Sequence, residues 1–170
     1  MSSKRPNVVV LFTDDQRFDT IAALGCEAIR TPNIDRLVDR GTAFTHAHIP
    51  CGTSGAVCMP SRAMLHTGRT LFHIQGQGAE LNPDHTMLGE HFQRHGYQTA
   101  GIGKWHNGTS SYARSFTDGG SILFGGMADH WNVPVNDFDP TGEYDNVKPI
   151  CDNPYFSNHF YEQHFDRIAS

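Results

Sequence analysis

A single cysteine, Cys58, stands two residues before Pro60 and four before Arg62 in the stretch CMPSR. Its thiol could fill the core, form a disulfide, ligate a metal, act as a nucleophile, or be modified before it works. A zinc site would need several thiolates or histidines at close spacing, and Cys51 supplies only a loose pair. A cysteine hydrolase stays open, because any of the 11 histidines could activate the thiol. None of these roles explains the rigid proline and the arginine that follow.

Two adjacent carboxylates, Asp14 and Asp15, directly follow the apolar run NVVVLF. Where a strand turns into a loop, neighbouring side chains can converge on one point. Two converging carboxylates repel each other, and a hard cation such as Ca²⁺ or Mg²⁺ relieves the repulsion by binding their oxygens. The alternative is that Asp15 caps a turn while Asp14 is only solvated.

Lys104 and His106 lie two residues apart in GKWHNG, so an extended chain places them on one side and Trp105 on the other. An ammonium and an imidazole together can bind an anion and transfer a proton. The alternative is a surface lysine beside a half-buried histidine. His91 and His95 have a helical spacing that suits zinc, but HFQRH lacks the glutamate of the metalloprotease motif, which favours an exposed helix face.

Hydrophobic patterning predicts the elements that carry these residues. The run at residues 7–12 is typical of a strand buried on both faces, and residues 43–49 alternate like a second strand. Thr31 and Gly41 bracket a short helix that begins with Pro32. Further elements are expected as a helix from Pro60 to Gly68, a helix over 87–95 capped by Thr86 and ended by Gly96, and a strand over 97–103.

The expected order is strand, helix, strand, helix, helix, strand, which indicates an α/β sheet with helices on both faces. In such sheets chemistry gathers where loops leave the carboxyl ends of strands, and all three polar clusters fall at such places. From Asn107 onward, frequent glycine, proline, asparagine and aspartate break the pattern, and only a helix near residues 159–169 is suggested.

Composition limits the function further. The chain has 170 residues, with 13 basic and 18 acidic side chains, so no polyanion-binding surface and no nucleic acid partner are expected. No apolar run approaches the roughly 20 residues that cross a bilayer, so no membrane partner is expected either. The start lacks a secretory signal, which favours the cytoplasm, or the periplasm or secretion if a signal was removed. Four cysteines are too few for a disulfide scaffold.

Taken together, the motifs resemble the type I sulfatases of the alkaline phosphatase superfamily. Residues 58–62 match their C-x-P-S-R signature, and GYQTAGIGKWH at 96–106 matches their second signature. The early DD pair and TPNIDRLVDRGTAFTHAH also look like the amino-terminal part of these enzymes, so the resemblance covers roughly residues 5 to 108 in family order. The chain departs from the family at Met59, where a small residue is usual, and at His66, where an apolar one is.

The resemblance implies an alkaline-phosphatase-like sandwich, with a mostly parallel central sheet flanked by helices. Family members run to several hundred residues and take a second pair of metal ligands, a lysine and a histidine from later sequence. Residues 1–170 are therefore expected to be the amino-terminal part of a sulfatase catalytic domain, with about half of an active site.

The resemblance also implies that a maturation enzyme converts Cys58 into formylglycine, whose aldehyde hydrates to a geminal diol. One hydroxyl would attack the sulfate ester, and the other would then expel sulfate as the aldehyde re-forms. Asp14, Asp15 and the residue derived from Cys58 would ligate Ca²⁺, with Mg²⁺ as the other possibility.

The remaining catalytic roles follow from the same resemblance. Arg62 would steady the diol and the metal-binding carboxylates, and Lys104 would bind the sulfate oxygens or the formylglycine. His106 would hydrogen-bond the hydroxyl that does not attack and help to remove its proton.

The resemblance predicts a sulfuric ester hydrolase acting on a small-molecule or saccharide sulfate ester. Two alternatives stay open. The first is a phosphodiesterase or phosphonate monoester hydrolase of the same superfamily. The second is an inactive truncated fragment with a binding role only.

Overall fold

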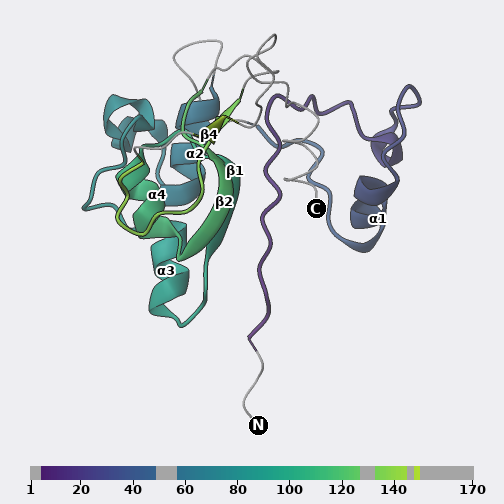
Figure 1. Ribbon diagram of the computed structural model, residues 1–170. Coiled ribbons are helices and arrows are strands. Elements are labelled where there is room, and N and C mark those ends of the chain that lie inside the picture. The colour runs from purple at the N-terminus through teal and green to yellow at the C-terminus, as the bar shows by residue number, and fades with distance from the viewer. Residues whose placement is uncertain (1–4, 49–56, 127–132, 145–147, 150–170) are drawn as a thin grey trace. The chain divides into compact units, whose positions relative to one another are not determined.

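The computed structural model describes residues 5–48, 57–126, 133–144 and 148–149 (Figure 1). The chain divides into two compact units, residues 1–48 and 49–170. Cys51, Cys151 and the helix expected near residues 159–169 lie outside the described residues. Within the described residues, no helix is long and apolar enough to cross a bilayer.

The first unit contains a 3-10 turn, η1 (Ala22–Leu24), and helix α1 (Pro32–Arg40). The predicted helix is confirmed, with Pro32 in its first turn, where the missing N–H costs nothing. Thr31 does not cap it through its side chain. Instead the Thr31 hydroxyl accepts a hydrogen bond from the Ala22 amide (2.8 Å) and donates one to Asp35 Oδ1 (2.7 Å), which joins η1 to α1.

The strand predicted at residues 7–12 is wrong. These residues form no strand, and Val9 and Leu11 are each 78% exposed. A strand buried on both faces needs partners beside it and layers above and below it. Among the described residues, the paired strands all lie in the second unit. The strand expected over 43–49 is also absent from its described part, residues 43–48.

The second unit holds the helices and strands that carry most of the candidate site. Its main elements are α2 (Cys58–Thr67), η2 (Leu71–His73), η3 (Gln75–Gly78), α3 (Leu88–Arg94), β1 (Ala100–Lys104), α4 (Thr109–Ser115) and β2 (Asp118–Leu123). The short strands β3 (Pro134–Val135) and β4 (Lys148–Pro149) pair antiparallel. An isolated bridge between Ile122 and Asn136 connects β2 to the β3 segment.

Three predicted elements of this unit are present with shifted ends. Helix α2 begins at Cys58, two residues before the predicted start, and ends before Gly68 as predicted. The α3 helix is capped at Met87, whose amide donates to Glu90 Oε2 (2.8 Å), and not at Thr86. Strand β1 starts later than predicted and runs through Lys104.

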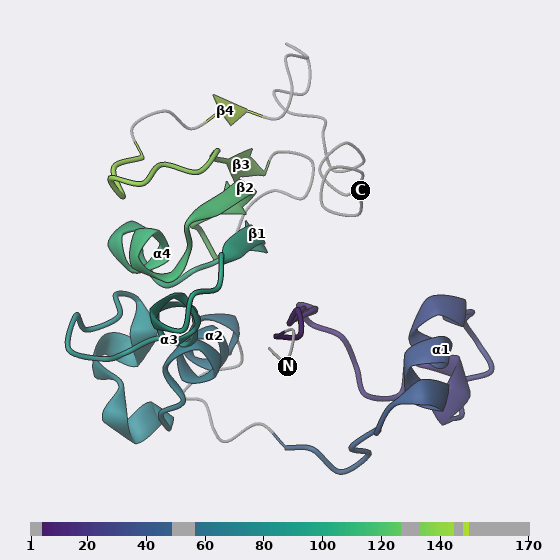
Figure 2. The same ribbon diagram turned by 90° about the horizontal axis from the view of Figure 1, so that it is seen from below.

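Strands β1 and β2 pair in parallel, with Gly101 opposite Gly119 and Ile102 opposite Gly120. Helix α4 connects them (Figure 2). Helices combined with a parallel sheet confirm the predicted α/β class. Helix α4 and strand β2 were not expected, because a serine-rich helix and a strand that begins Asp-Gly-Gly lack the usual hydrophobic periodicity.

The close approach of α4 to the sheet depends on glycine. Tyr112 is 1% exposed, and its hydroxyl donates a hydrogen bond to the Gly101 carbonyl oxygen (2.6 Å). A Cβ added at Gly119 would lie 2.1 Å from the Tyr112 oxygen and 2.5 Å from the Gly101 carbonyl oxygen. Gly101 and Gly119 therefore have no room for side chains on the face of the sheet that α4 covers.

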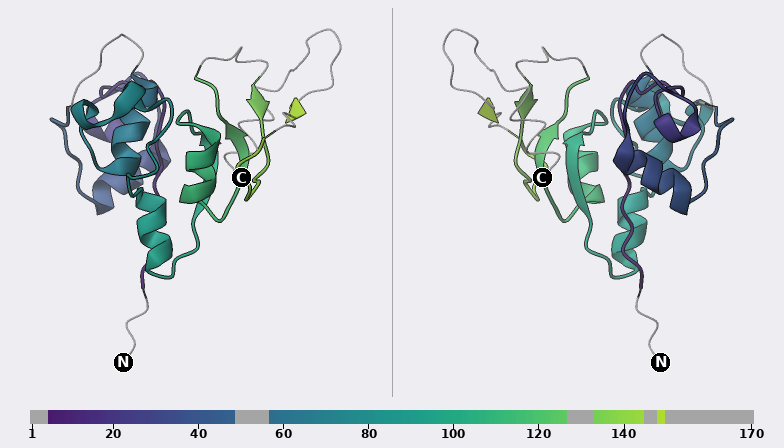
Figure 3. Two further views of the ribbon diagram at one scale, coloured as in Figure 1. Left: turned by 90° about the vertical axis from the view of Figure 1, so that its left-hand side faces the viewer. Right: turned by 90° about the vertical axis from the view of Figure 1, so that its right-hand side faces the viewer.

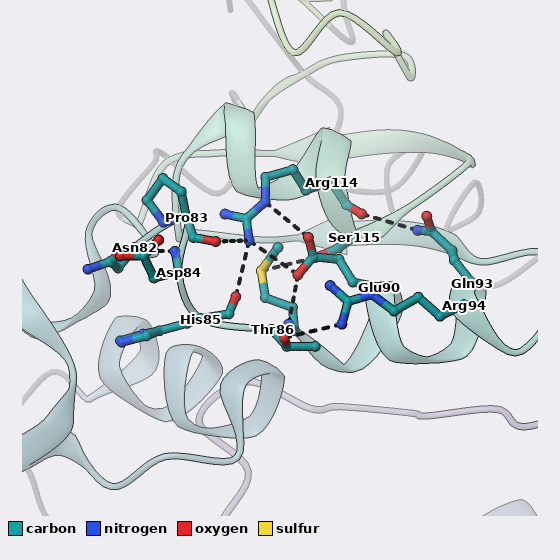
Figure 4. A network of polar contacts seen from close by, with 11 residues as sticks. Asn82, Pro83, Asp84, His85, Thr86, Glu90, Gln93, Arg94, Arg114 and Ser115 are labelled. Carbon is teal, nitrogen blue, oxygen red and sulfur yellow. Dashed lines mark hydrogen bonds and ion pairs between the residues drawn. The ribbon is translucent and has the colours of Figure 1, made fainter.

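A polar network joins α3 to α4, which pack against each other (Figures 3 and 4). Arg114 donates to both carboxylate oxygens of Glu90 (3.1 and 3.2 Å) and to the carbonyl oxygens of Pro83 (3.0 Å) and His85 (3.1 Å). Gln93 adds a hydrogen bond to the Arg114 carbonyl oxygen (3.2 Å). A bidentate pair with added carbonyl acceptors fixes the two helices more firmly than a single exposed ion pair would.

We expect Gly119→Ala to lower the free energy of unfolding by about 2 kcal/mol, because its Cβ would overlap the buried Tyr112 hydroxyl and the backbone carbonyl oxygen of Gly101. Gly120→Ala is the matched control, since a Cβ there meets nothing within 4 Å. Urea unfolding of the two variants measures the difference. Equal losses would show that the contact with Tyr112 does not limit position 119.

Candidate functional site

Helix α2 presents Cys58 as its first residue and Arg62 one turn later. Pro60 lies in the first turn, where its lack of an N–H is tolerated, and Gly68 closes the helix in a left-handed conformation (φ 64°). The Cys58 thiol is half-buried and free, whereas Arg62 is only 6% exposed. The helix thus holds a thiol at its start and a cation within the interior.

The chain leaves β1 at Lys104 and turns Trp105 into the core. Trp105 is 3% exposed, and its indole N–H donates to the Gly108 carbonyl oxygen (2.7 Å). Lys104 and His106, the residues on either side of it, are half-buried. The two candidate residues therefore keep contact with solvent while the residue between them anchors the loop.

Two hydrogen bonds join this loop to α2. The Arg62 guanidinium donates to the Lys104 carbonyl oxygen (2.5 Å), and the Asn107 amide donates to the Met59 carbonyl oxygen (3.0 Å). The bonds link residues that are 42 and 48 positions apart in the chain. They bring the predicted residues Cys58, Arg62, Lys104 and His106 into one part of the second unit.

His106 has an uncommon backbone conformation, with φ at 72°. Histidine is among the few residues other than glycine that are enriched there, and such conformations cluster at functional sites. The tip of its ring lies against Gly126, since a Cβ at that glycine would come within 2.0 Å of both Cε1 and Nε2. The absence of a side chain at position 126 therefore sets where the imidazole lies.

His66 lies on the inner side of α2 and packs on the ring of Trp105, with ring centroids 4.4 Å apart. Burial, helped by the positive charge of Arg62, lowers the pKa of His66 to about 4. A neutral imidazole stacked on an indole packs much like an apolar side chain. This explains how the position accommodates histidine where the resemblance to the sulfatases predicts an apolar residue.

Asp14 and Asp15 belong to the first unit, where they form an exposed bend. Asp15 has a left-handed backbone (φ 53°), a conformation that aspartate tolerates better than most residues. Two adjacent carboxylates provide the hard oxygen ligands that Ca²⁺ prefers. Within the described ranges, no cluster of three or more His, Cys, Asp or Glu side chains could hold a metal ion.

The structure adds residues that sequence reasoning missed and leaves others outside the site. Asn107 and Gly126 contact the segments that carry Cys58 and His106, but an Asn-Gly pair and a Gly-Gly pair give only turn signals in sequence. His91 of α3 and His95, the residue after that helix, are exposed, with ring centroids 4.5 Å apart.

We expect stability to fall between pH 6.5 and pH 4 because of His66. Its folded-state pKa of about 4 lies below the usual value near 6.5, so the unfolded chain takes up a proton first and the neutral contact is fully favourable only above pH 6.5. The loss attributable to this group by pH 4 is on the order of 3 kcal/mol. His66→Phe should remove this part of the pH dependence in urea unfolding; parallel curves for the two proteins would contradict it.

Comparison with known proteins gives one consistent family. The sulfatase family model matches residues 6–169. The chain is 36% identical over 107 residues to an N-acetylglucosamine-6-O-sulfatase of Bacteroides thetaiotaomicron, covering 61% of this chain and 18% of that protein. It is 32% identical over 127 residues to human steryl-sulfatase, covering 67% of this chain and 21% of the relative.

A third relative matches along nearly the whole chain. It is an uncharacterized sulfatase of Schizosaccharomyces pombe, 31% identical over 203 residues, with 99% of this chain and 35% of that protein covered. The chain spans 18% to 35% of the length of these three relatives. No solved structure matches the chain. Because the family model covers almost all of its residues, the chain belongs to the sulfatase family, with the alkaline-phosphatase-like α/β fold of that family.

Proposed function

We propose that the complete protein containing this chain hydrolyses a sulfate monoester, with Cys58 as the precursor of its nucleophile. The observation that carries the proposal is the pair of hydrogen bonds that joins the first turn of α2 to the Lys104–His106 loop in a chain of the sulfatase family. The two joined segments carry a thiol (Cys58), a guanidinium (Arg62), an ammonium (Lys104) and an imidazole (His106). These groups suit attack on an anionic ester better than a structural role.

The position of Cys58 supports its conversion to formylglycine by a maturation enzyme. The residue begins α2, keeps partial exposure, and precedes a proline and an arginine that match the family signature. Once hydrated, formylglycine supplies one hydroxyl to attack sulfur and a second through which sulfate is released.

The surrounding side chains would supply the remaining catalytic roles. The Lys104 ammonium binds the sulfate oxygens and so offsets their negative charge. The imidazole of His106 accepts a proton from the hydroxyl that does not attack. Arg62 is buried beside them and bonded to the Lys104 carbonyl oxygen, so its charge acts from a fixed place.

Asp14 and Asp15 would hold a divalent cation, Ca²⁺ or Mg²⁺, because adjacent carboxylates match its preference for oxygen ligands. The cation would supply positive charge that favours the ionised form of the attacking hydroxyl.

The substrate class is a small-molecule or saccharide sulfate ester. The matched relatives include one named for an N-acetylglucosamine sulfate and one named for a steryl sulfate. These names agree in the ester and differ in the alcohol, so they support the sulfate monoester as the shared feature.

Conversion and activity can be tested together at Cys58. In protein made with the maturation enzyme, the Cys58 peptide should be lighter by about 18 Da, the change from a thiol to an aldehyde. Cys58→Ala should lower the kcat for a chromogenic aryl sulfate by on the order of 10⁴-fold or more without unfolding the protein.

Cys26→Ala is the matched control, because Cys26 is also a free, half-buried cysteine but lies in the other unit. It should keep full activity. Full activity of Cys58→Ala would exclude the proposed mechanism. Faster turnover of a phosphate diester or a phosphonate ester by the unsubstituted protein would show that the substrate is not a sulfate ester and would favour the phosphodiesterase or phosphonate hydrolase alternative.

The role of His106 can be tested without substituting it. Gly126→Ala adds a Cβ where the ring tip lies, so the imidazole must move, and misplacement of this kind should lower kcat by about tenfold to a hundredfold. Gly125→Ala is the control, since its Cβ would meet only Leu123 Cδ1 at an ordinary 3.7 Å. Equal kcat values for both variants would contradict the proposed role of His106 in the reaction.

A further inference from the structure

Asn107 is the most completely buried polar residue beside the candidate site. Its exposed fraction is 0%, and its side-chain amide nitrogen donates two hydrogen bonds, to the carbonyl oxygens of Met59 (3.0 Å) and Gly78 (2.6 Å). Met59 directly follows Cys58, and Asn107 directly follows His106. One side chain therefore connects the residues next to two candidate catalytic groups.

The backbone around Asn107 is itself held in place. Its carbonyl oxygen accepts a hydrogen bond from the hydroxyl of Ser111, and the Gly108 carbonyl oxygen accepts one from the Trp105 indole (2.7 Å). The amide of Asn107 thus extends from a fixed loop. A hydrogen bond from a fixed loop can hold the start of α2 in place, whereas one from a mobile loop could not.

The second acceptor belongs to η3, which packs tightly on α2. A Cβ at Gly78 would lie 2.3 Å from the Cβ of Ala63, so this close approach requires glycine. Asn107 therefore bonds to α2 and to the segment that supports α2 from the side.

Only a side chain with two donors on one atom satisfies this site. Two carbonyl oxygens face the same nitrogen, and an NH₂ group is the one neutral group that can donate to both. The amide oxygen of Asn107 is buried and accepts no hydrogen bond from the residues that the structure describes. A leucine would avoid that unsatisfied acceptor but would leave the buried Gly78 carbonyl and the half-buried Met59 carbonyl without their donor.

We infer that Asn107 is a positioning residue, which sets the placement of the α2 first turn and Cys58 relative to the loop of Lys104 and His106. The bond from Arg62 to the Lys104 carbonyl oxygen is a second tie, one turn further along α2. Two separated ties fix both the position and the rotation of the helix end, whereas one alone leaves a pivot. The catalytic meaning of this inference rests on the proposed function.

Hydrogen exchange tests the tie without requiring activity. Asn107→Leu should accelerate amide exchange in peptides covering residues 58–62 by about tenfold, since the start of α2 loses one of the two hydrogen bonds that join it to the loop. Tyr112→Phe is the matched control, because it also removes a buried side-chain hydrogen bond, the one to the Gly101 carbonyl oxygen (2.6 Å), but contacts no residue of this tie. It should leave exchange at 58–62 unchanged.

Turnover of an aryl sulfate by the complete, matured protein tests the consequence. At a temperature where all variants are folded, Asn107→Leu should lower kcat by about tenfold or more and change KM less than about twofold, because geometry and not binding is lost. Tyr112→Phe should keep the unsubstituted kcat.

Asn107→Asp gives a second, nearly isosteric variant. Its carboxylate would face two carbonyl oxygens, whereas its protonated form can donate to one of them, so its kcat relative to the unsubstituted protein should rise as the pH is lowered. A merely space-filling role for position 107 would give no such recovery.

The outcomes separate the two proposals. Unchanged exchange and kcat in Asn107→Leu, or equal losses in Tyr112→Phe, would overturn the positioning role. If Asn107→Leu does not fold, a pH-independent activity ratio for Asn107→Asp would overturn it instead. A matured unsubstituted protein without sulfatase activity, but with the exchange difference intact, would overturn the proposed function and leave the tie between α2 and the loop.

Discussion

The arrangement of the second unit depends on two hydrogen bonds that cross from α2 to the loop after β1. Arg62 and Asn107 are both buried. Arg62 of α2 donates a hydrogen bond to a backbone carbonyl oxygen of the loop, and Asn107 of the loop donates one to a backbone carbonyl oxygen of α2. A buried donor that loses its acceptor is costly to leave unpaired, which makes the contact specific as well as stabilising. Because the acceptors are backbone atoms, the bonds locate the chain itself, and every side chain carried by the helix start and by the loop is located with it. The chemistry proposed at Cys58 and His106 requires this kind of placement.

Aromatic packing and glycine provide the support behind these bonds. Trp105 fills the interior between α2 and α4, with His66 on one side of it and Tyr112 near its edge. The lowered pKa of His66 keeps that ring neutral, so a titratable residue can serve in the core. Gly101 and Gly119 let α4 approach the sheet, and Gly78 lets η3 approach α2. These glycines are needed because atoms of neighbouring residues occupy the space that a side chain would take.

Sequence reasoning succeeded where a signal is local. The start of α1 at Pro32, the end of α2 at Gly68 and the class of fold follow from caps, stops and the alternation of elements. It failed at residues 7–12, where an apolar run favoured a buried strand but the side chains are exposed, because pairing depends on distant partners and not on composition. It also missed α4 and β2, because their serines and glycines give no hydrophobic pattern that would indicate burial. Tyr112 and Ser115 are buried by contacts made far along the chain, which no short window contains.

The sequence by itself determined the family of the chain, because a spaced set of residues such as C-x-P-S-R is specific without any knowledge of shape. It also predicted Cys58, Arg62, Lys104 and His106 as the side chains that would carry out the proposed reaction. Only the tertiary structure decided that hydrogen bonds join the segments that carry them, that Trp105 is the buried anchor between Lys104 and His106, and that Asn107 bonds to the residue after Cys58. The physical reason is that hydrogen bonds and close packing act between atoms near in space, and the residues concerned are more than 40 positions apart in the chain.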